Sequence, residues 1–179
     1  MFAKAIILAF AKHNQEANVK VVEILDGKFS AAARQEERGS YYGSLEGLTK
    51  HIAGGTLALL RMAKTALSAD ANAQNVLIAL DDLSVDANPL DINGWQKLKA
   101  AIAAADRAWV NLAATLNDRD YDAPVKTEWY GGNPASIPLG ALLTNLASHN
   151  IHHRGQLSQI FDSLKIDNDY SAIGLQFFS

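Results

Sequence analysis

The chain has 179 residues, 49% of them hydrophobic and 20% charged, which is typical of one folded domain with a substantial core over residues 1–179. Sixteen basic and 19 acidic residues leave a formal net charge of −3, and this small, diffuse excess gives no broad basic surface for direct nucleic-acid binding. The chain has no cysteine, so disulfides, thiolate ligands and cysteine nucleophiles are excluded, and any metal must be held by nitrogen and oxygen.

The first helix is predicted from about Phe2 to Asp26, with Gly27 as its C-terminal stop. Its apolar opening is too short to span a bilayer and runs into polar sequence without a cleavage signature, so we expect a cytoplasmic protein. His13 lies on the apolar stripe, where a hydrogen-bonded, half-buried histidine is a simpler interpretation than a site residue. The predicted inner stripe comprises Ile6, Phe10, Ala17, Val21 and Ile24, with Asn14 and Asn18 beside it.

The second helix is predicted from Ser44, which suits an N-cap after a loop over residues 28–43, to about Leu67. His51 lies at the edge of its apolar face. Gly54 and Gly55 fall in the helix interior, where each weakens the helix by roughly 1 kcal/mol relative to alanine. Two such residues indicate the close approach of a neighbouring helix or a ligand.

A polar crossover over residues 69–90 precedes the third helix, which is predicted from about Asn93 to Asn117. Asp106 falls in the middle of the apolar stripe of this helix, where a carboxylate is costly unless it is paired. Two kinds of partner fit. One is an arginine such as Arg154, and the other is a metal-ligating histidine that Asp106 would support.

Residues 125–137 combine β-branched and aromatic residues with a Gly131-Gly132-Asn133 turn signal, which predicts a short hairpin or an extended excursion. Pro138 suits the start of a fourth helix that runs to about Leu164. The tail that follows carries Tyr170, Phe177 and Phe178, which we expect to pack on the body or on a partner chain. Four long amphipathic helices indicate an all-α four-helix bundle, an architecture that builds metal sites between facing helices.

His149 and His153 lie in the apolar stripe of the fourth helix, within roughly 20–30° of the line through Leu142 and Leu146. Histidines at i and i+4 on one face are spaced to share a metal ion. Capped core histidines and a surface cluster with His152 are the alternatives. The leucine stripe argues against the surface cluster, and two buried imidazoles in one turn would both need hydrogen-bond partners.

Other catalytic motifs are absent from the sequence. Asn150 stands where a HExxH motif has its glutamate, so the helix has no built-in general base. No GxSxG, GxxxxGK[ST] or GxGxxG motif occurs, and the carboxylate spacing of di-iron bundles is missing as well.

Three stretches of the sequence resemble one family. HNIHHRGQL, from His149 to Leu157, resembles the HxxxHRGQ[IL] signature of the DinB-like (DNA-damage-inducible, YfiT-like) metalloenzymes. LTKHIA, residues 48–53, is similar to the segment that supplies that family's first metal ligand, and Asn14 and Asn18 fit the opening pattern of its first helix. The resemblance extends over most of the chain.

The resemblance implies a four-helix bundle with an unusual connection order, often found as a homodimer. It also implies a mononuclear site of His51, His149 and His153, without His152, holding a divalent metal such as nickel or zinc. Three neutral nitrogens with open positions are the arrangement of a catalytic site.

Relatives of this kind are similar to metal-dependent thiol S-transferases and thiol-dependent isomerases, and a hydrolase activity fits the site equally well. Because the chain has no cysteine, a low-molecular-weight thiol would be a cosubstrate beside the small-molecule substrate. Asp106 and Gln156 are the candidate catalytic residues, Asp106 to orient a ligand or act as a base and Gln156 to line the pocket. The alternatives are a noncatalytic, dimeric metal-binding stress-response protein and a plain bundle without metal, against which the three histidines argue.

Overall fold

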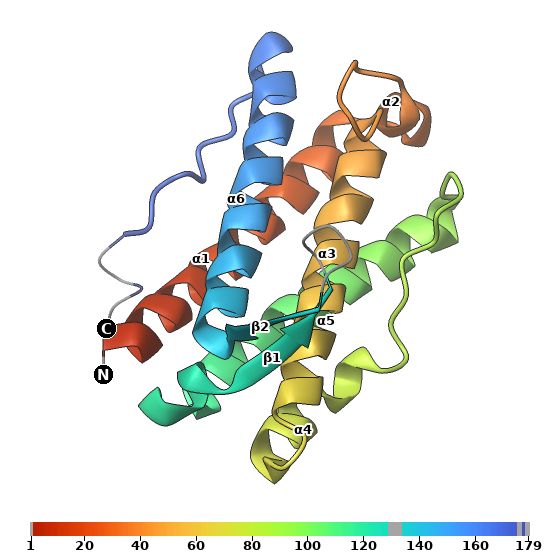
Figure 1. Cartoon of the computed structure of the whole chain (residues 1–179). Helices are drawn as coiled ribbons and strands as arrows, with labels where there is room; N and C mark the ends of the chain where they lie inside the picture. Colours follow the sequence, from red (N-terminus) through yellow and green to blue (C-terminus); the bar gives the residue numbers. More distant parts are fainter. Residues whose placement is uncertain (1, 129–133, 175–176, 178–179) are drawn as a thin grey trace.

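The computed structural model describes residues 2–128, 134–174 and 177, and four long helices dominate it (Figure 1). They are α1 (Phe2–Lys28), α3 (Leu45–Ala66), α5 (Ile92–Thr115) and α6 (Leu139–Ser163). The shorter elements are α2 (Ala31–Gln35), α4 (Ala71–Leu77), the 3-10 helices η1 (Ile78–Leu80) and η2 (Asp118–Asp122), and the strands β1 (Pro124–Thr127) and β2 (Ala135–Pro138). The predicted all-α bundle is confirmed. None of the helices in these ranges combines the length and the apolar character that crossing a membrane requires.

The helix ends follow local capping chemistry. The Ser44 hydroxyl accepts a hydrogen bond from the Gly47 N–H at 3.0 Å, so the predicted N-cap of α3 is confirmed. The Asp70 carboxylate accepts from two N–H groups in the first turn of α4, which gives the predicted crossover a helix of its own. The stop predicted at Gly27 is wrong, because α1 continues through it to Lys28. A glycine costs some helix stability but does not by itself end a helix.

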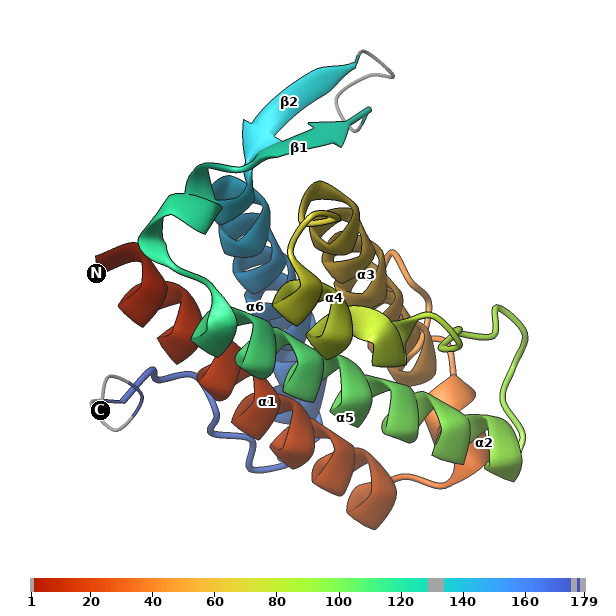
Figure 2. The same cartoon turned by 90° about the horizontal axis from the view of Figure 1, so that it is seen from below.

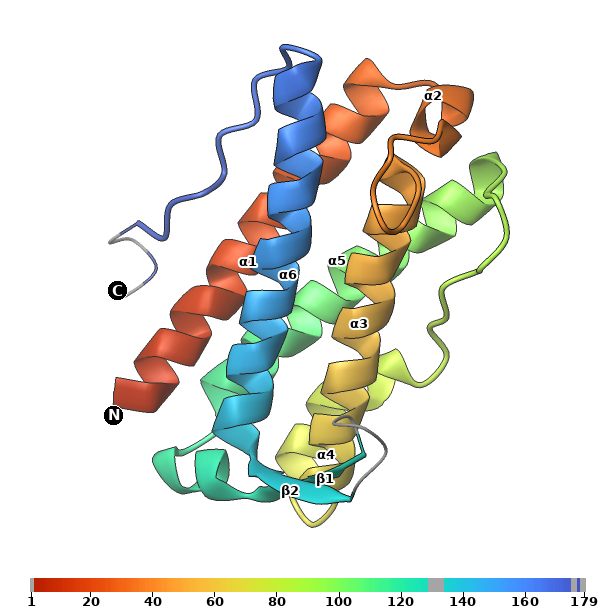
Figure 3. The ribbon, with the colours of Figure 1, turned by 45° about the horizontal axis from the view of Figure 1, so that its top comes forward.

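The long helices form two layers. Figure 3 shows α3 and α6 side by side, with α1 and α5 behind them. Helix α1 packs mainly on α5, α3 packs mainly on α6, and contacts of α1 with α6 and of α3 with α5 close the bundle. The consecutive long helices α1 and α3 therefore lie in different layers, and the two helices expected to carry the histidines are neighbours.

The predicted hairpin is present. Strands β1 and β2 pair antiparallel, with Val125 opposite Ile137, and they project from the end of the bundle where α6 begins (Figure 2). The predicted turn at residues 131–133 lies outside the described residues. The tail returns along α6 towards the N-terminal end of α1 (Figure 1), with Tyr170 and Phe177 buried, so the expectation that it packs on the body is confirmed for these two residues. Phe178 lies outside the described residues.

The apolar core divides into two clusters. One surrounds Trp109, between the ends of the helices near the hairpin, and the other contains Leu48 and Phe161. Along each long helix, buried polar side chains fall at or near the change from one cluster to the other. Six of them are joined by hydrogen bonds, namely Asn14 and Asn18 of α1, Thr56 of α3, Asp106 of α5, and Asn150 and Arg154 of α6. We call these six side chains the polar layer.

Candidate metal centre

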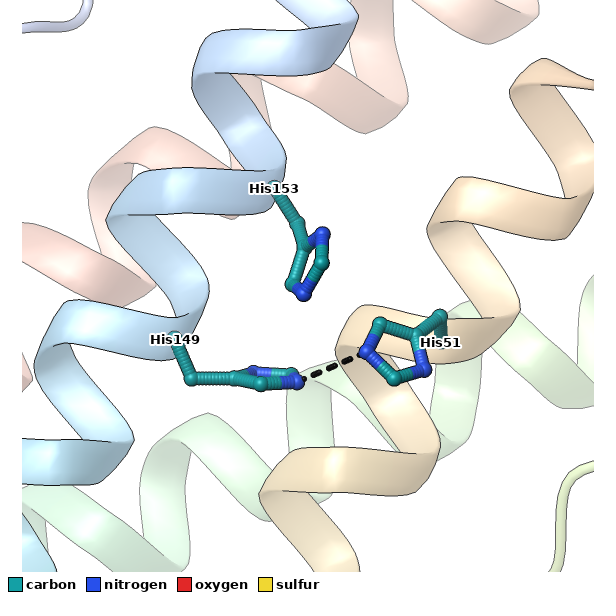
Figure 4. Close-up of side chains that lie close together, drawn as sticks. All are labelled: His51, His149 and His153. Atoms are coloured by element: carbon teal, nitrogen blue, oxygen red, sulfur yellow. Dashed lines mark hydrogen bonds between the residues drawn. The ribbon is translucent and has the colours of Figure 1, made fainter. Parts of the chain in front are cut away.

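Three histidines converge between α3 and α6. His51 extends from α3 and His149 and His153 from α6, so that their rings face one another (Figure 4). One potential ligand nitrogen from each lies within 4.8 Å of the others. His153 is buried, whereas His51 and His149 are partly exposed. The structure thus contains a group of three histidines that could bind a metal ion.

The close packing of α3 on α6 at this point depends on Gly55. A Cβ atom added at Gly55 would lie 2.4 Å from Cε1 of the His149 ring, which is far inside van der Waals contact. A Cβ atom at Gly54 would meet nothing within 4 Å. The close approach predicted for both glycines is therefore confirmed for Gly55 and wrong for Gly54.

Side-chain carbonyl groups orient two of the three imidazoles. His149 Nδ1 lies 3.0 Å from Oδ1 of Asn150, and His153 Nδ1 lies 2.7 Å from Oε1 of Gln156. Because a carbonyl oxygen can only accept, each Nδ1 carries the proton and each Nε2 keeps its lone pair. A ligating histidine whose other nitrogen donates to a carbonyl is the usual arrangement in metal sites.

The donor set fits a metal ion. Nε2 of His149 lies 2.9 Å from Nε2 of His51. Nitrogens that share a tetrahedral ion at about 2.0–2.1 Å are roughly 3.4 Å apart, so only small side-chain movements would be needed. Burial lowers the pKa of His51 to about 4, with a further contribution from the neighbouring histidines, and burial also lowers the pKa of His153. Both are neutral at pH 7, the form that binds metal.

Tyr42 covers one side of the group. Its ring stacks on His51 with a centroid distance of 3.8 Å and an interplanar angle of 18°, and it meets His153 edge-on at 5.3 Å. Sequence reasoning missed this residue because it lies in a loop that no helical period aligns with His51. His152 is exposed and lies outside the group, as the family resemblance implied.

The two candidate catalytic residues differ in position, because only Gln156 contacts a histidine of the group. Gln156 is bound to His153. Asp106 is only 2% exposed, and its carboxylate accepts from the amides of Asn14, at 2.7 Å, and Asn18, at 3.0 and 3.1 Å. These asparagines stand between Asp106 and Arg154, so the direct ion pair that the sequence suggested is replaced by a bridge. The base role of Asp106 stays a prediction, and its contacts favour an orienting role.

Burial shifts the pKa of both charged members of the polar layer. It raises the pKa of Asp106 to about 7, against the opposing effect of the asparagine hydrogen bonds and of Arg154. It lowers the pKa of the Arg154 guanidinium to about 10, and the Asp106 charge opposes this change. The two groups therefore stabilise each other's charged forms in a site where burial disfavours both.

His13 lies apart from the three-histidine group. It is 5% exposed, more buried than predicted, and the ring of Phe177 from the tail meets it edge-on at 5.7 Å. Burial lowers its pKa, and the charges of Arg154 and Lys20 lower it further. It belongs to the contact between α1 and the tail.

The fold and the site together define a class of protein, a four-helix bundle in which α3 and α6 bring three histidines to one point. A model of the DinB family matches residues 1–164, and the chain belongs to this family. The resemblance noted in the sequence is thereby confirmed. No curated protein matches the chain in sequence.

Proposed function

We propose that the protein is a metal-dependent enzyme of thiol S-transferase or hydrolase type, with His51, His149 and His153 as the ligands of one divalent ion. The convergence of the three imidazoles, two of them with Nδ1 tied to a carbonyl oxygen, carries this proposal. Nickel and zinc both suit imidazole ligands. Three ligands leave open positions, and a divalent ion held in this way supplies the Lewis acidity that activates water or a thiol near neutral pH.

A cavity beside the centre supports an enzyme over a noncatalytic metal-binding protein. It has a volume of about 370 Å³ and lies between α6 and the loop before α3. Gln156 is part of its wall, so the cavity begins one side chain away from His153. Polar and basic groups dominate the wall, including Arg38, Ser40, Gln159 and Ser163. This lining suits a small polar molecule, such as a low-molecular-weight thiol cosubstrate or a carboxylate-bearing substrate.

The chain's own residues have separable roles in this proposal. Asn150 and Gln156 fix the ring orientation of the two α6 histidines, and Tyr42 restrains His51 by stacking on it. Gln156 and Arg38 would hold the polar part of the bound molecule. A homodimer, a cytoplasmic location and induction by DNA damage stay predictions.

The first experiment measures the metal content of protein purified without a histidine tag, beside the His51→Ala variant. We expect about one nickel, zinc or similar ion per chain in the wild type and a loss of most of it in the variant, because two imidazoles hold an ion far more weakly than three. The His149→Ala and His153→Ala variants should behave like His51→Ala, whereas His152→Ala should stay near wild type. Equal losses in all four variants would reject the ligand assignment.

Activity screens then separate the two reaction types. The metal-loaded protein is incubated with a chromogenic electrophile and a panel of low-molecular-weight thiols, and separately with chromogenic esters. Product formation that requires both the thiol and His51 supports the transferase, whereas turnover of esters without thiol supports the hydrolase. A wild type that takes up no metal even after zinc or nickel is added would overturn the enzyme proposal.

A further inference from the structure

The hydrogen bonds of the polar layer begin at the Asp106 carboxylate, which acts as their first acceptor. Both oxygens of the Asp106 carboxylate accept hydrogen bonds, from Nδ2 of Asn14 and Nδ2 of Asn18. Because the hydrogen bonds to Asp106 are donated by the amide nitrogens, each amide turns its NH₂ group towards α5 and its oxygen towards α6. Arg154 donates to both of these oxygens, with Nη1 3.2 Å from Oδ1 of Asn18. The orientation of the two α1 amides is therefore set by the charges on either side.

The same orientation is passed on to α6. Oδ1 of Asn14 accepts from Nδ2 of Asn150 at 3.0 Å, and Nδ2 of Asn150 also donates to the Thr56 hydroxyl at 3.0 Å. With its NH₂ group directed at these two acceptors, Asn150 has only its oxygen left for His149. Oδ1 of Asn150 lies 3.0 Å from Nδ1 of His149. A continuous series of hydrogen bonds thus runs from Asp106 through Asn14 and Asn150 to an imidazole of the histidine group.

The direction of this series decides the tautomer of His149. Each member donates towards Asp106 and accepts from the next, so the last donor must be Nδ1–H of His149, and Nε2 keeps its lone pair on the side of His51. If Asn150 were turned over, its NH₂ group would face Nδ1. That would favour the tautomer with hydrogen on Nε2, which cannot ligate a metal through that atom.

We infer that the polar layer positions the metal centre, and that Asn150 is the positioning residue through which it acts on His149. The inference rests on the proposed function, since it concerns the same three ligands. It explains why six polar side chains from all four long helices are buried between the two apolar clusters. Each helix contributes to the layer, so the register of the four helices and the orientation of the ligand are fixed together.

The test compares Asn150→Ala with Asn150→Asp, measuring zinc dissociation constants by competition with a chelator. Loss of such a partner typically weakens metal binding 10–100-fold, which is the expected result for Asn150→Ala. A carboxylate at this position still accepts from His149 Nδ1–H but cannot donate to Asn14 or Thr56. Asn150→Asp should therefore recover most of the lost affinity while its unfolding midpoint in urea falls.

Thr49→Val is the matched control. It removes a buried hydroxyl of α3 that donates to the Leu45 carbonyl oxygen at 2.7 Å and belongs neither to the polar layer nor to the histidine group, so it should leave zinc affinity near wild type. The inference is overturned if Asn150→Ala binds zinc as the wild type does, or if Asn150→Asp is as weak as Asn150→Ala.

A spectrum of the metal-free protein tests the inference independently of metal uptake. Long-range ¹H–¹⁵N correlations, recorded well above the ordinary histidine pKa of about 6.5, report which ring nitrogen of His149 carries hydrogen. We expect hydrogen on Nδ1 in the wild type and a mixture of tautomers in Asn150→Ala. Hydrogen on Nε2 in the wild type would overturn the inference even if the protein binds zinc. A wild type that shows the Nδ1–H tautomer but takes up no metal would instead reject the proposed function.

Discussion

The two faces of α6 use polar residues in opposite ways. Towards α3, His149 and His153 present the ring nitrogens that keep their lone pairs, with Nε2 of His149 2.9 Å from Nε2 of His51, and His149 is partly exposed. Towards α1, Asn150 and Arg154 are 0% and 3% exposed, and their side chains are bound to other buried groups. One helix therefore carries a face that is available for chemistry and a face whose polar groups are committed to the fold. Mutations on the two faces should have different consequences.

The largest effect is expected in the polar layer, which joins Asn150 and Arg154 of α6 to Asp106 of α5. Asp106→Ala removes the acceptor for Asn14 and Asn18 and leaves the Arg154 charge buried without its counterpart. Breaking a buried charge pair in this way typically costs about 3–5 kcal/mol of unfolding free energy. Urea denaturation of the metal-free protein measures it.

Asp81→Ala is the control for this change. Asp81 forms an ion pair with Lys64 at 2.6 Å, but its side chain is 51% exposed. Such surface pairs contribute about 0–1 kcal/mol. If Asp106→Ala costs no more than Asp81→Ala, the polar layer does not hold the bundle together.

The second prediction concerns the open face of α6, which carries His149 and His153 towards α3. Gly55→Ala places a methyl group against the His149 ring, and overpacking of this kind costs about 1–3 kcal/mol. Because the ring has to shift from its position beside His51, zinc affinity should fall about tenfold or more. Gly54→Ala is the neighbouring control, since its methyl group meets nothing and should stabilise α3 by roughly 0.5–1 kcal/mol. Competition with a chelator and urea denaturation provide the two measurements, and equal zinc affinities for both variants would contradict the packing argument.

Much of the difference between the two faces of α6 could be predicted from the sequence. Helical periodicity predicted the four long helices, and the spacing of His149 and His153 on a leucine stripe indicated a shared metal ion. His51 required the family resemblance, because it lies at the edge of its helical face. The role of Asn150 was not predictable, since it depends on which residues of α1 and α3 face it across the bundle.

The apolar stripe predicted for α1 shows the same limit. Ile6, Phe10 and Ile24 are only partly buried, whereas Asn14 and Asn18 are 2% and 5% exposed. Hydrophobicity places apolar residues inward, but here a buried carboxylate and a buried guanidinium on other helices draw the amides in and rotate α1. Such a partnership between helices leaves no periodic signal in the sequence of one helix.

The third prediction concerns His13, a buried titratable group of α1 that packs against the tail. Its pKa in the folded protein lies below the ordinary value of 6.5, through burial first and then through Arg154 and Lys20. The unfolded chain therefore binds more protons below pH 6.5, so His13 makes the folded state less stable as the pH falls through that value. Glu16 and Asp169 line the same cavity as His13.

The His13→Gln variant should show a shallower loss of unfolding free energy than the wild type between about pH 7 and pH 5. Urea denaturation of the metal-free proteins across this range measures the slopes. His152→Gln serves as the control, because His152 is exposed and lies outside the contact between α1 and the tail. Identical slopes for His13→Gln and the wild type would show that His13 titrates in the same way in the folded and the unfolded chain.

The smallest effect is expected for Tyr42, which touches the open face without ligating. Its ring stacks on His51 and restrains that ring, and aromatic pairs contribute about 0.5–1.5 kcal/mol beyond their buried area. Tyr42→Leu should therefore weaken zinc binding about three- to tenfold in chelator competition. Tyr41→Leu should change it less, because Tyr41 is 89% exposed. A loss for Tyr42→Leu as large as that for Gly55→Ala would mean that the loop before α3, and not the packing of α3 on α6, holds His51 in place.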